Sequence, residues 1–200
     1  MRPPLIGLTG RKYAGKTEAA RVLGSHGYDG AHIAITDPMI EIAIPILKAL
    51  GCNDYFERLS PNGTRKDEPI PGYPWLTGRK ILQMIGKEMR DALSRPTDNP
   101  PEGNMFGTDG QLFFDMWEGR LKDSDLKVNA SVRYPFEADI IHSRGGIVWR
   151  IINPEAPEPE DDHPSERQDW AVDREIIAPH SKGLKYLYAQ IEQALADASA

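Results

Sequence analysis

Short apolar runs alternate with helical patterns along this chain of 200 residues. The apolar runs are typical of buried strands and occupy five stretches, 5–9, 32–35, 126–131, 146–152 and 175–178. Parallel strands need long crossover connections, and these are usually helices. The alternation therefore predicts an α/β fold in which a five-stranded parallel sheet is flanked by helices.

The last helix has the clearest amphipathic pattern. Its apolar residues recur at i, i+3, i+4, i+7 and i+11, at Leu184, Leu187, Tyr188, Ile191 and Leu195. We expect this apolar face to pack on the sheet. The helix after the first strand is expected to end between Gly24 and Gly27, where glycine and histidine supply C-terminal signals.

About ninety residues separate the second and third predicted strands, far more than a crossover requires. Helical patterns at 38–50, 78–93 and 111–121 are separated by loops rich in proline and glycine. We interpret 38–121 as a helical substrate-binding lobe inserted into a single domain, because such insertions lie over the ligand-binding edge of a sheet. The acidic, proline-rich stretch 153–169 resembles a linker in composition and a lid in position.

Residues 10–17 read Gly-Arg-Lys-Tyr-Ala-Gly-Lys-Thr, a complete G-x-x-x-x-G-K-T phosphate-binding loop between a predicted strand and a predicted helix. Backbone N–H groups and the helix dipole favour an anion at such a turn. Lys16 is expected to contact the β- and γ-phosphates of a nucleoside triphosphate, and the Thr17 hydroxyl to ligate Mg²⁺. The predicted site consists of Gly10, Ala14, Gly15, Lys16 and Thr17.

The bulk composition narrows the range of partners. A net charge of −6 argues against polymeric nucleic acid as a partner, whereas basic residues clustered near the loop indicate a small polyanion. The single cysteine, Cys52, excludes an intrachain disulfide. No stretch approaches the roughly 18 apolar residues of a membrane span. We therefore expect a cytoplasmic protein without a membrane partner.

The helix predicted at 78–93 has a mostly cationic polar face. Four residues fall at i, i+4, i+8 and i+11 and share this face: Arg79, Gln83, Lys87 and Arg90. It is either a solvated surface or a phosphate-binding one, and arginine suits phosphate because it makes bidentate contacts. Gly86 costs the helix about 1 kcal/mol relative to alanine, which indicates that another group approaches closely.

Two charged residues follow predicted strands. Arg133 follows the third strand, where it is expected to stabilise charge shared between donor and acceptor phosphates. An aspartate that orders Mg²⁺ is often found there, yet this strand ends in Ser131. Asp37, after the second strand, is the best remaining carboxylate. It either orients metal or substrate or caps a helix beginning at Pro38, and both roles are compatible.

Other catalytic patterns are missing from the sequence. None of the five histidines pairs with Cys52 or with another histidine at zinc spacing, and no G-x-S-x-G nucleophile motif is found. The four tryptophans suit core or lobe packing, although Trp75 could instead stack on a base.

Several segments together resemble one family. Besides the phosphate loop they are 35–38, the R-x-x-L-Q-x-x-G helix at 79–86, the strand end at 132–138 and the H-x-S-E element at 163–166. In this order they are similar, over most of the chain, to the deoxynucleoside monophosphate kinases of tailed bacteriophages, within the P-loop nucleotide kinases. The resemblance implies a P-loop kinase fold. It also implies ATP-dependent phosphoryl transfer to a deoxynucleoside 5′-monophosphate.

The resemblance also assigns roles to residues. Lys16, Arg133 and Asp37 would be catalytic, and ATP with Mg²⁺ would bind the phosphate loop and His180, which lies where the family has a turn near the adenine. The monophosphate would contact Asp37, Arg79, Gln83, Lys87, Arg90 and Arg133.

The chain departs from the family in two further places. Ser131 replaces the family aspartate, and Asn153 stands where an arginine is usual, so that the lid arginine would be Arg167 or Arg174. Two alternatives stay open: a kinase of another small acceptor, such as a nucleoside or dephospho-coenzyme A, and a non-catalytic nucleotide-binding regulatory protein. A hydroxyl acceptor would benefit from a carboxylate such as Asp37, whereas a phosphate oxygen needs no general base. The sequence leaves open the base, the sugar and a homodimer.

Overall fold

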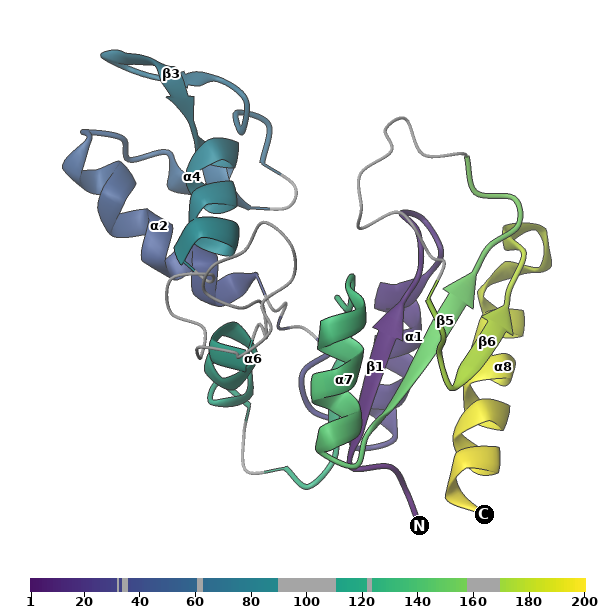
Figure 1. Ribbon diagram of the computed structural model, residues 1–200. Coiled ribbons are helices and arrows are strands. Elements are labelled where there is room, and N and C mark those ends of the chain that lie inside the picture. The colour runs from purple at the N-terminus through teal and green to yellow at the C-terminus, as the bar shows by residue number, and fades with distance from the viewer. Residues whose placement is uncertain (32, 34–35, 61–62, 90–110, 122–123, 158–169) are drawn as a thin grey trace. The chain divides into compact units, whose positions relative to one another are not determined.

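A computed structural model describes residues 1–31, 33, 36–60, 63–89, 111–121, 124–157 and 170–200. The chain divides into two compact units. The first unit combines Met1–Ala34 with Glu118–Ala200, and the second is Ile35–Trp117. Figure 1 shows the elements of both units along the chain.

The first unit is built on a parallel sheet. Within the described residues the sheet has four strands in the order β4 (Lys127–Asn129), β1 (Leu5–Thr9), β5 (Ile147–Ile152) and β6 (Arg174–Ile177). Every neighbouring pair is parallel, and in Figure 1 the arrows of β1, β5 and β6 point the same way. All five residues of β1 are buried. The predicted α/β class and parallel sheet are confirmed.

The second predicted strand, 32–35, falls almost entirely outside the described residues. Just before it, the backbone N–H of Asp29 donates to the Leu126 carbonyl at 2.9 Å, and the N–H of Val128 donates to the Asp29 carbonyl at 2.7 Å. These bonds form a parallel bridge between Asp29 and Lys127. The chain therefore meets the edge of β4 that faces away from β1.

Three helices flank this sheet: α1 (Lys16–Ser25), α7 (Pro135–Ser143) and α8 (Gly183–Ser199). As predicted, α1 ends before Gly27, which adopts φ 94°. The predicted stripe on α8 is buried at Leu187, Ile191 and Leu195, but the prediction is wrong for Leu184, which is 53% exposed. The buried part packs with β1 and β5 in one core.

The second unit has its own apolar core. Its elements are α2 (Asp37–Ala49), α3 (Tyr55–Leu59), β2 (Pro69–Ile70), β3 (Tyr73–Thr77), α4 (Gly78–Met84), the π-helix η1 (Ile85–Met89) and α6 (Gln111–Glu118). Ala43, Leu47, Ile81 and Phe113 form the centre of this core. The unit covers nearly the same residues as the predicted lobe, whose role in substrate binding stays a prediction.

The second unit contains elements that the sequence pattern did not indicate. The helix α3 and the antiparallel β2–β3 hairpin were not predicted. The helical segment predicted at 78–93 is α-helical only as far as Met84. Residues 90–93 and the loop 94–110 lie outside the described residues. Trp75 is 65% exposed in β3, so the prediction of packing is wrong there, whereas Trp117 and Trp149 are buried as expected.

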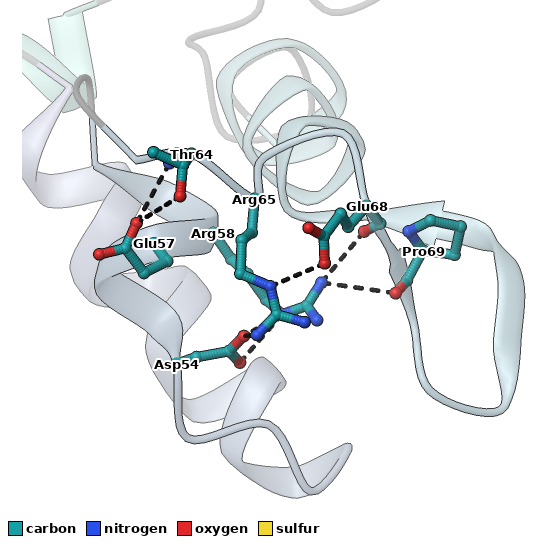
Figure 2. Close-up of polar contacts among 7 residues, drawn as sticks. All are labelled: Asp54, Glu57, Arg58, Thr64, Arg65, Glu68 and Pro69. Atoms are coloured by element: carbon teal, nitrogen blue, oxygen red, sulfur yellow. Dashed lines mark hydrogen bonds and ion pairs between the residues drawn. The ribbon is translucent and has the colours of Figure 1, made fainter.

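A buried arginine fastens the hairpin to α3 (Figure 2). Arg58 is 2% exposed, and its Nε donates to both carboxylate oxygens of Asp54 at 2.9 and 3.0 Å. Its Nη1 donates to the Glu68 carbonyl at 3.0 Å. Arg65 also pairs with Asp54, and its Nε donates to the Glu68 carboxylate at 2.7 Å. Every charge of this cluster is thus matched within the second unit.

In the described part of the chain, no helix is both long and apolar enough to cross a membrane.

Candidate functional site

The phosphate-loop segment connects β1 to α1 as the motif requires. β1 ends at Thr9 and α1 begins at Lys16. Gly10 has φ 144°, and a Cβ there would lie 2.4 Å from the Ile151 carbonyl oxygen. Only glycine therefore allows the loop to pass so close to β5. Gly15, with φ 98°, is the N-cap of α1 and leaves that end without a side-chain cap.

Lys16 folds back over the loop that precedes it. Its Nζ donates to the carbonyl oxygens of Gly10 at 2.6 Å and Arg11 at 2.8 Å. The ammonium group is therefore held beside the start of α1, where the helix dipole is also positive. Together these groups form an electropositive loop.

Tyr13 gives the loop a strained backbone. Among the described residues it is the one non-glycine with a positive φ, 65°. This conformation costs roughly 1–2 kcal/mol for a residue with a Cβ. The Lys12 Nζ lies 4.8 Å from the centroid of the Tyr13 ring, which is 58% exposed. Alternation of left- and right-handed residues turns successive N–H groups to one side, the arrangement that makes anion-binding nests.

A cavity of about 270 Å³ adjoins the loop. It lies within the first unit, between the loop, the end of β5 and the turn after β5. Its lining consists of Gly10, Arg11, Ala14, Arg150, Ile151, Ile152, Asn153, Pro154 and Ala156. Most of this lining is apolar, so Arg11, Arg150 and Asn153 supply its side-chain polar groups.

Two buried side chains at the cavity keep N–H groups without an acceptor. Asn153 is 8% exposed, and its Nδ2 has no partner among the described residues. Arg150, also 8% exposed, donates from Nη1 to Glu175 at 2.7 Å and from Nη2 to the Trp170 carbonyl. Its Nε is likewise without an acceptor in the described chain. Such a buried donor costs about 1–3 kcal/mol, which a bound ligand or water can recover.

The turn after β5 is clamped to the segment before α8. The Ser181 N–H donates to Glu155 at 2.7 Å, and the Ser181 hydroxyl donates to the other oxygen of the same carboxylate. These hydrogen bonds hold the pKa of Glu155 below its ordinary value. The backbone N–H of His180 donates to Asn153 Oδ1 at 3.3 Å. His180 thus contacts a cavity residue through its backbone, while its side chain is exposed.

The end of β4 lies beside the end of β1. Gly7 and Asn129 are register partners in parallel strands, so the segments that follow them leave the same edge of the sheet. The Ser131 N–H and hydroxyl both donate to Asn129 Oδ1 at 2.9 Å. Asn129 is fully buried, and its Nδ2 has no acceptor within the described chain. A serine–asparagine pair therefore occupies the position where an aspartate that orders Mg²⁺ is often found.

Arg133 is exposed just before α7. Its backbone N–H and that of Tyr134 donate to the buried carboxylate of Glu137, at 3.0 Å for Tyr134. This capping box, with Pro135 in the first turn, explains why α7 begins here. The backbone of Arg133 is fixed, and its guanidinium lies at the surface.

The remaining predicted acceptor residues lie in the second unit. α2 begins at Asp37 with Thr36 as its N-cap, so the interpretation of Asp37 as the cap before Pro38 is wrong. The carboxylate still lies in the first turn, where the helix dipole favours it. Arg79 makes a bidentate ion pair with Asp67, at 2.6 and 2.9 Å.

The π-helix changes the predicted cationic face. Hydrogen bonds from i to i+5 replace the α-helical pattern after Met84, so the i+8 spacing from Arg79 does not hold. Gln83 is exposed, while the side chain of Lys87 and all of Arg90 lie outside the described residues. A Cβ on Gly86 would lie 3.2 Å from Met39 Sδ of α2. The group that approaches this glycine is therefore a side chain of the same unit.

Neither candidate for the lid arginine is seen in that role. Arg167 and the H-x-S-E element lie outside the described residues, and Arg174 in β6 is paired with Asp197 of α8 at 2.7 Å. In the part of the chain that the structure describes, no cluster of three His, Cys, Asp or Glu residues could hold a metal. Mg²⁺ that arrives with a nucleotide takes ligands from phosphates and water, so exposed Thr17 remains the predicted protein ligand.

Fold and site define an α/β protein with a parallel sheet, flanked by helices, whose first strand leads into a G-x-x-x-x-G-K-T loop. No model of a known protein family matches the chain, and no curated protein matches it in sequence. What the protein does is therefore argued from the chemistry of the site.

Sequence reasoning missed two residues that shape this site. Arg150 is a charged residue in the middle of an apolar strand, and that contrast was a usable signal. Asn153 stands out in the sequence only as a departure from the family's arginine, and it was not predicted to shape the site. Its place beside the loop depends on the pairing of β5 with β1.

Proposed function

We propose that this protein is a P-loop kinase that transfers the γ-phosphoryl group of ATP to a deoxynucleoside 5′-monophosphate. The observation that carries the proposal is the loop 10–17, wrapped around its own lysine and adjoining a cavity of about 270 Å³. The bridge at Asp29 supports the finer proposal of a fifth parallel strand beyond β4.

The donor half of the reaction would use the first unit. Backbone N–H groups of the loop, the start of α1 and Lys16 would hold the triphosphate, and they carry positive charge where negative charge accumulates during transfer. Thr17 would hold Mg²⁺, which neutralises phosphate charge when bound. Arg133 follows the strand next to β1, and its exposed guanidinium is available for the transferring group.

The acceptor half would use the second unit. Asp37, Arg79 and Gln83, with Lys87 and Arg90, are the proposed contacts of the monophosphate. The acceptor atom would be a phosphate oxygen that is ionised at neutral pH, so no general base is required. Positioning and electrostatics would then provide most of the rate enhancement.

A panel assay tests the proposal. The full chain with ATP and Mg²⁺ is incubated with dTMP, dGMP, dCMP or dAMP, and with nucleosides and dephospho-coenzyme A, and ADP release is measured. We expect turnover with at least one monophosphate. Turnover only with a nucleoside or with dephospho-coenzyme A, which offer a hydroxyl group, would refute the proposal and would indicate a kinase that phosphorylates a hydroxyl.

Lys16→Ala supplies the matched test of the loop. It should lower turnover by at least a hundredfold, because a charge aimed at the transferring phosphates is lost. Lys185→Ala, an exposed lysine on α8, is the control and should leave turnover unchanged. Near-normal rates in Lys16→Ala would refute the proposed phosphate site.

One observation favours a second candidate, a nucleotide-binding regulatory protein without turnover. The serine–asparagine pair at the end of β4 offers no carboxylate to order a metal. In that case ATP would bind the wild-type chain and would bind more weakly to Lys16→Ala. No acceptor in the panel would lead to release of ADP.

A further inference from the structure

Tyr13 occupies a turn position that favours glycine. The Ala14 N–H donates to the Arg11 carbonyl at 3.2 Å, which closes a four-residue turn with Tyr13 in the third position. Of the two central residues of this turn, Tyr13 alone has a positive φ, 65°. This is the pattern of a type II turn, whose third position is usually glycine because a residue with a Cβ is strained there.

The Tyr13 side chain does little to offset this strain within the described chain. It is 58% exposed, so it contributes little to the core. The Lys12 Nζ lies 4.8 Å from the ring centroid, but a cation–π contact at so exposed a site stabilises no more than the strain costs. Strained residues cluster at sites that bind ligands. The strain therefore indicates that Tyr13 serves binding rather than stability.

Tyr13 belongs to the half of the loop where the terminal phosphate is expected. In loops of this kind the backbone N–H groups cradle the α- and β-phosphates, and the lysine reaches the β- and γ-phosphates. The Lys16 Nζ donates to the carbonyl oxygens of Gly10 and Arg11, so the ammonium group lies over the first half of the loop. Tyr13 is not among the described residues that line the cavity beside the loop. Its exposed ring is therefore separate from that cavity.

We propose that Tyr13 contacts the bound nucleotide, with its phenol hydroxyl donating a hydrogen bond to the terminal phosphate of a nucleoside triphosphate. This inference rests on the proposed function and goes beyond it by assigning recognition of the third phosphate to one side chain. A hydrogen bond from a phenol to an ionised phosphate oxygen is charge-assisted and therefore strong. A diphosphate has no group at this position, so Tyr13 would make the loop prefer a triphosphate to a diphosphate.

The test compares Tyr13→Phe with wild-type protein by titration calorimetry in the presence of Mg²⁺. This change removes only the hydroxyl, because the ring, its contact with Lys12 and the strained backbone are retained. Tyr186→Phe in α8 is the matched control, since the Lys182 Nζ lies 4.6 Å from the centroid of that ring. ATP and ADP are the ligands compared, and inorganic tripolyphosphate shows whether the contact is made to phosphate.

We expect Tyr13→Phe to weaken ATP and tripolyphosphate by about fivefold or more, and ADP by less than about twofold. Tyr186→Phe should leave all three affinities within about twofold. A second variant, Tyr13→Gly, should lose ATP affinity at least as strongly. Its melting temperature should equal or exceed that of wild-type protein, because relief of strain offsets the greater freedom of glycine in the unfolded chain.

The inference is overturned if Tyr13→Phe binds ATP as tightly as wild-type protein, or if it weakens ATP and ADP equally. A loss for ATP without a loss for tripolyphosphate also overturns it, since the contact would then be made to the nucleoside. A lower melting temperature of Tyr13→Gly would show that the side chain stabilises the fold, which contradicts the argument from strain. All of these results leave the proposed function standing. Failure of wild-type protein to bind either ATP or tripolyphosphate would instead overturn both.

Discussion

Gly10→Ala is the most informative single change at the phosphate loop. Two separate penalties meet at this position. The backbone has φ 144°, which residues with a Cβ rarely adopt, and the new Cβ would lie 2.4 Å from the Ile151 carbonyl oxygen. That oxygen belongs to the backbone of a central strand, so it cannot move aside as a flexible side chain would.

The two penalties can be separated with a second glycine. Gly27→Ala, after α1, has φ 94° and no heavy atom within 4 Å of the new Cβ, so it measures backbone strain alone. We expect Gly27→Ala to cost about 1–2 kcal/mol. Gly10→Ala should cost a further 1–3 kcal/mol, roughly, for the forced contact. For a chain of this size the combined loss lowers the melting temperature by about 4–20 °C.

Urea unfolding followed by circular dichroism, with ATP titrations on the folded variants, measures both effects. The loop of Gly10→Ala must move away from β5, so ATP affinity should fall, whereas Gly27→Ala should bind ATP normally. If Gly10→Ala is no less stable than Gly27→Ala and binds ATP equally well, the close approach of loop and strand is wrong.

Three further changes test other parts of the structure. Gly86→Ala should be neutral or mildly stabilising in thermal unfolding, because Met39 can shift and alanine favours a helix; a selective loss of monophosphate affinity would indicate a ligand there instead. Glu155→Gln should reduce stability at neutral pH, because the carboxylate pKa is lowered mainly by Ser181. Because the pKa of Glu155 is lower in the folded state, its carboxylate stabilises the fold at pH values above its ordinary pKa. This stabilisation is lost as the pH falls through the pKa of the folded state, so the melting temperatures of wild-type protein and Glu155→Gln should converge in acid. Arg58→Met should cost about 1–3 kcal/mol in urea unfolding, because it removes the buried donor of the Glu68 carbonyl while Arg65 still pairs with Asp54; no measurable loss would contradict that role.

The parts of the fold that local pattern could predict are those with a strong local cause. The loop 10–17 carries its own glycines and lysine, and α8 has a long apolar repeat. The start of α7 also has local signals in the sequence, Pro135 in the first turn and Glu137 of the capping box. The β2–β3 hairpin also has a local turn signal, because Gly72, with φ 81°, turns the chain between the two strands.

The end of β4 also has a local cause: the strand stops at Asn129 rather than at 131, because the Asn129 side chain accepts a hydrogen bond from the N–H of Ser131 in a turn. Other features depend on tertiary contacts that no local pattern contains. The segment Ile85–Met89 adopts a π-helix where the apolar pattern indicated a continuing α-helix. Met39 lies close to Gly86 within that segment, and this contact could not be read from spacing alone.

The candidate site follows the same division. The phosphate loop could be predicted because anion binding needs only backbone N–H groups, a lysine and a helix start, all contributed by consecutive residues. The cavity could not, because it exists only where Gly10 passes within contact of β5 and where Glu155 holds the following turn against Ser181. The loop therefore has a local cause in the sequence, and the cavity beside it requires the assembled sheet.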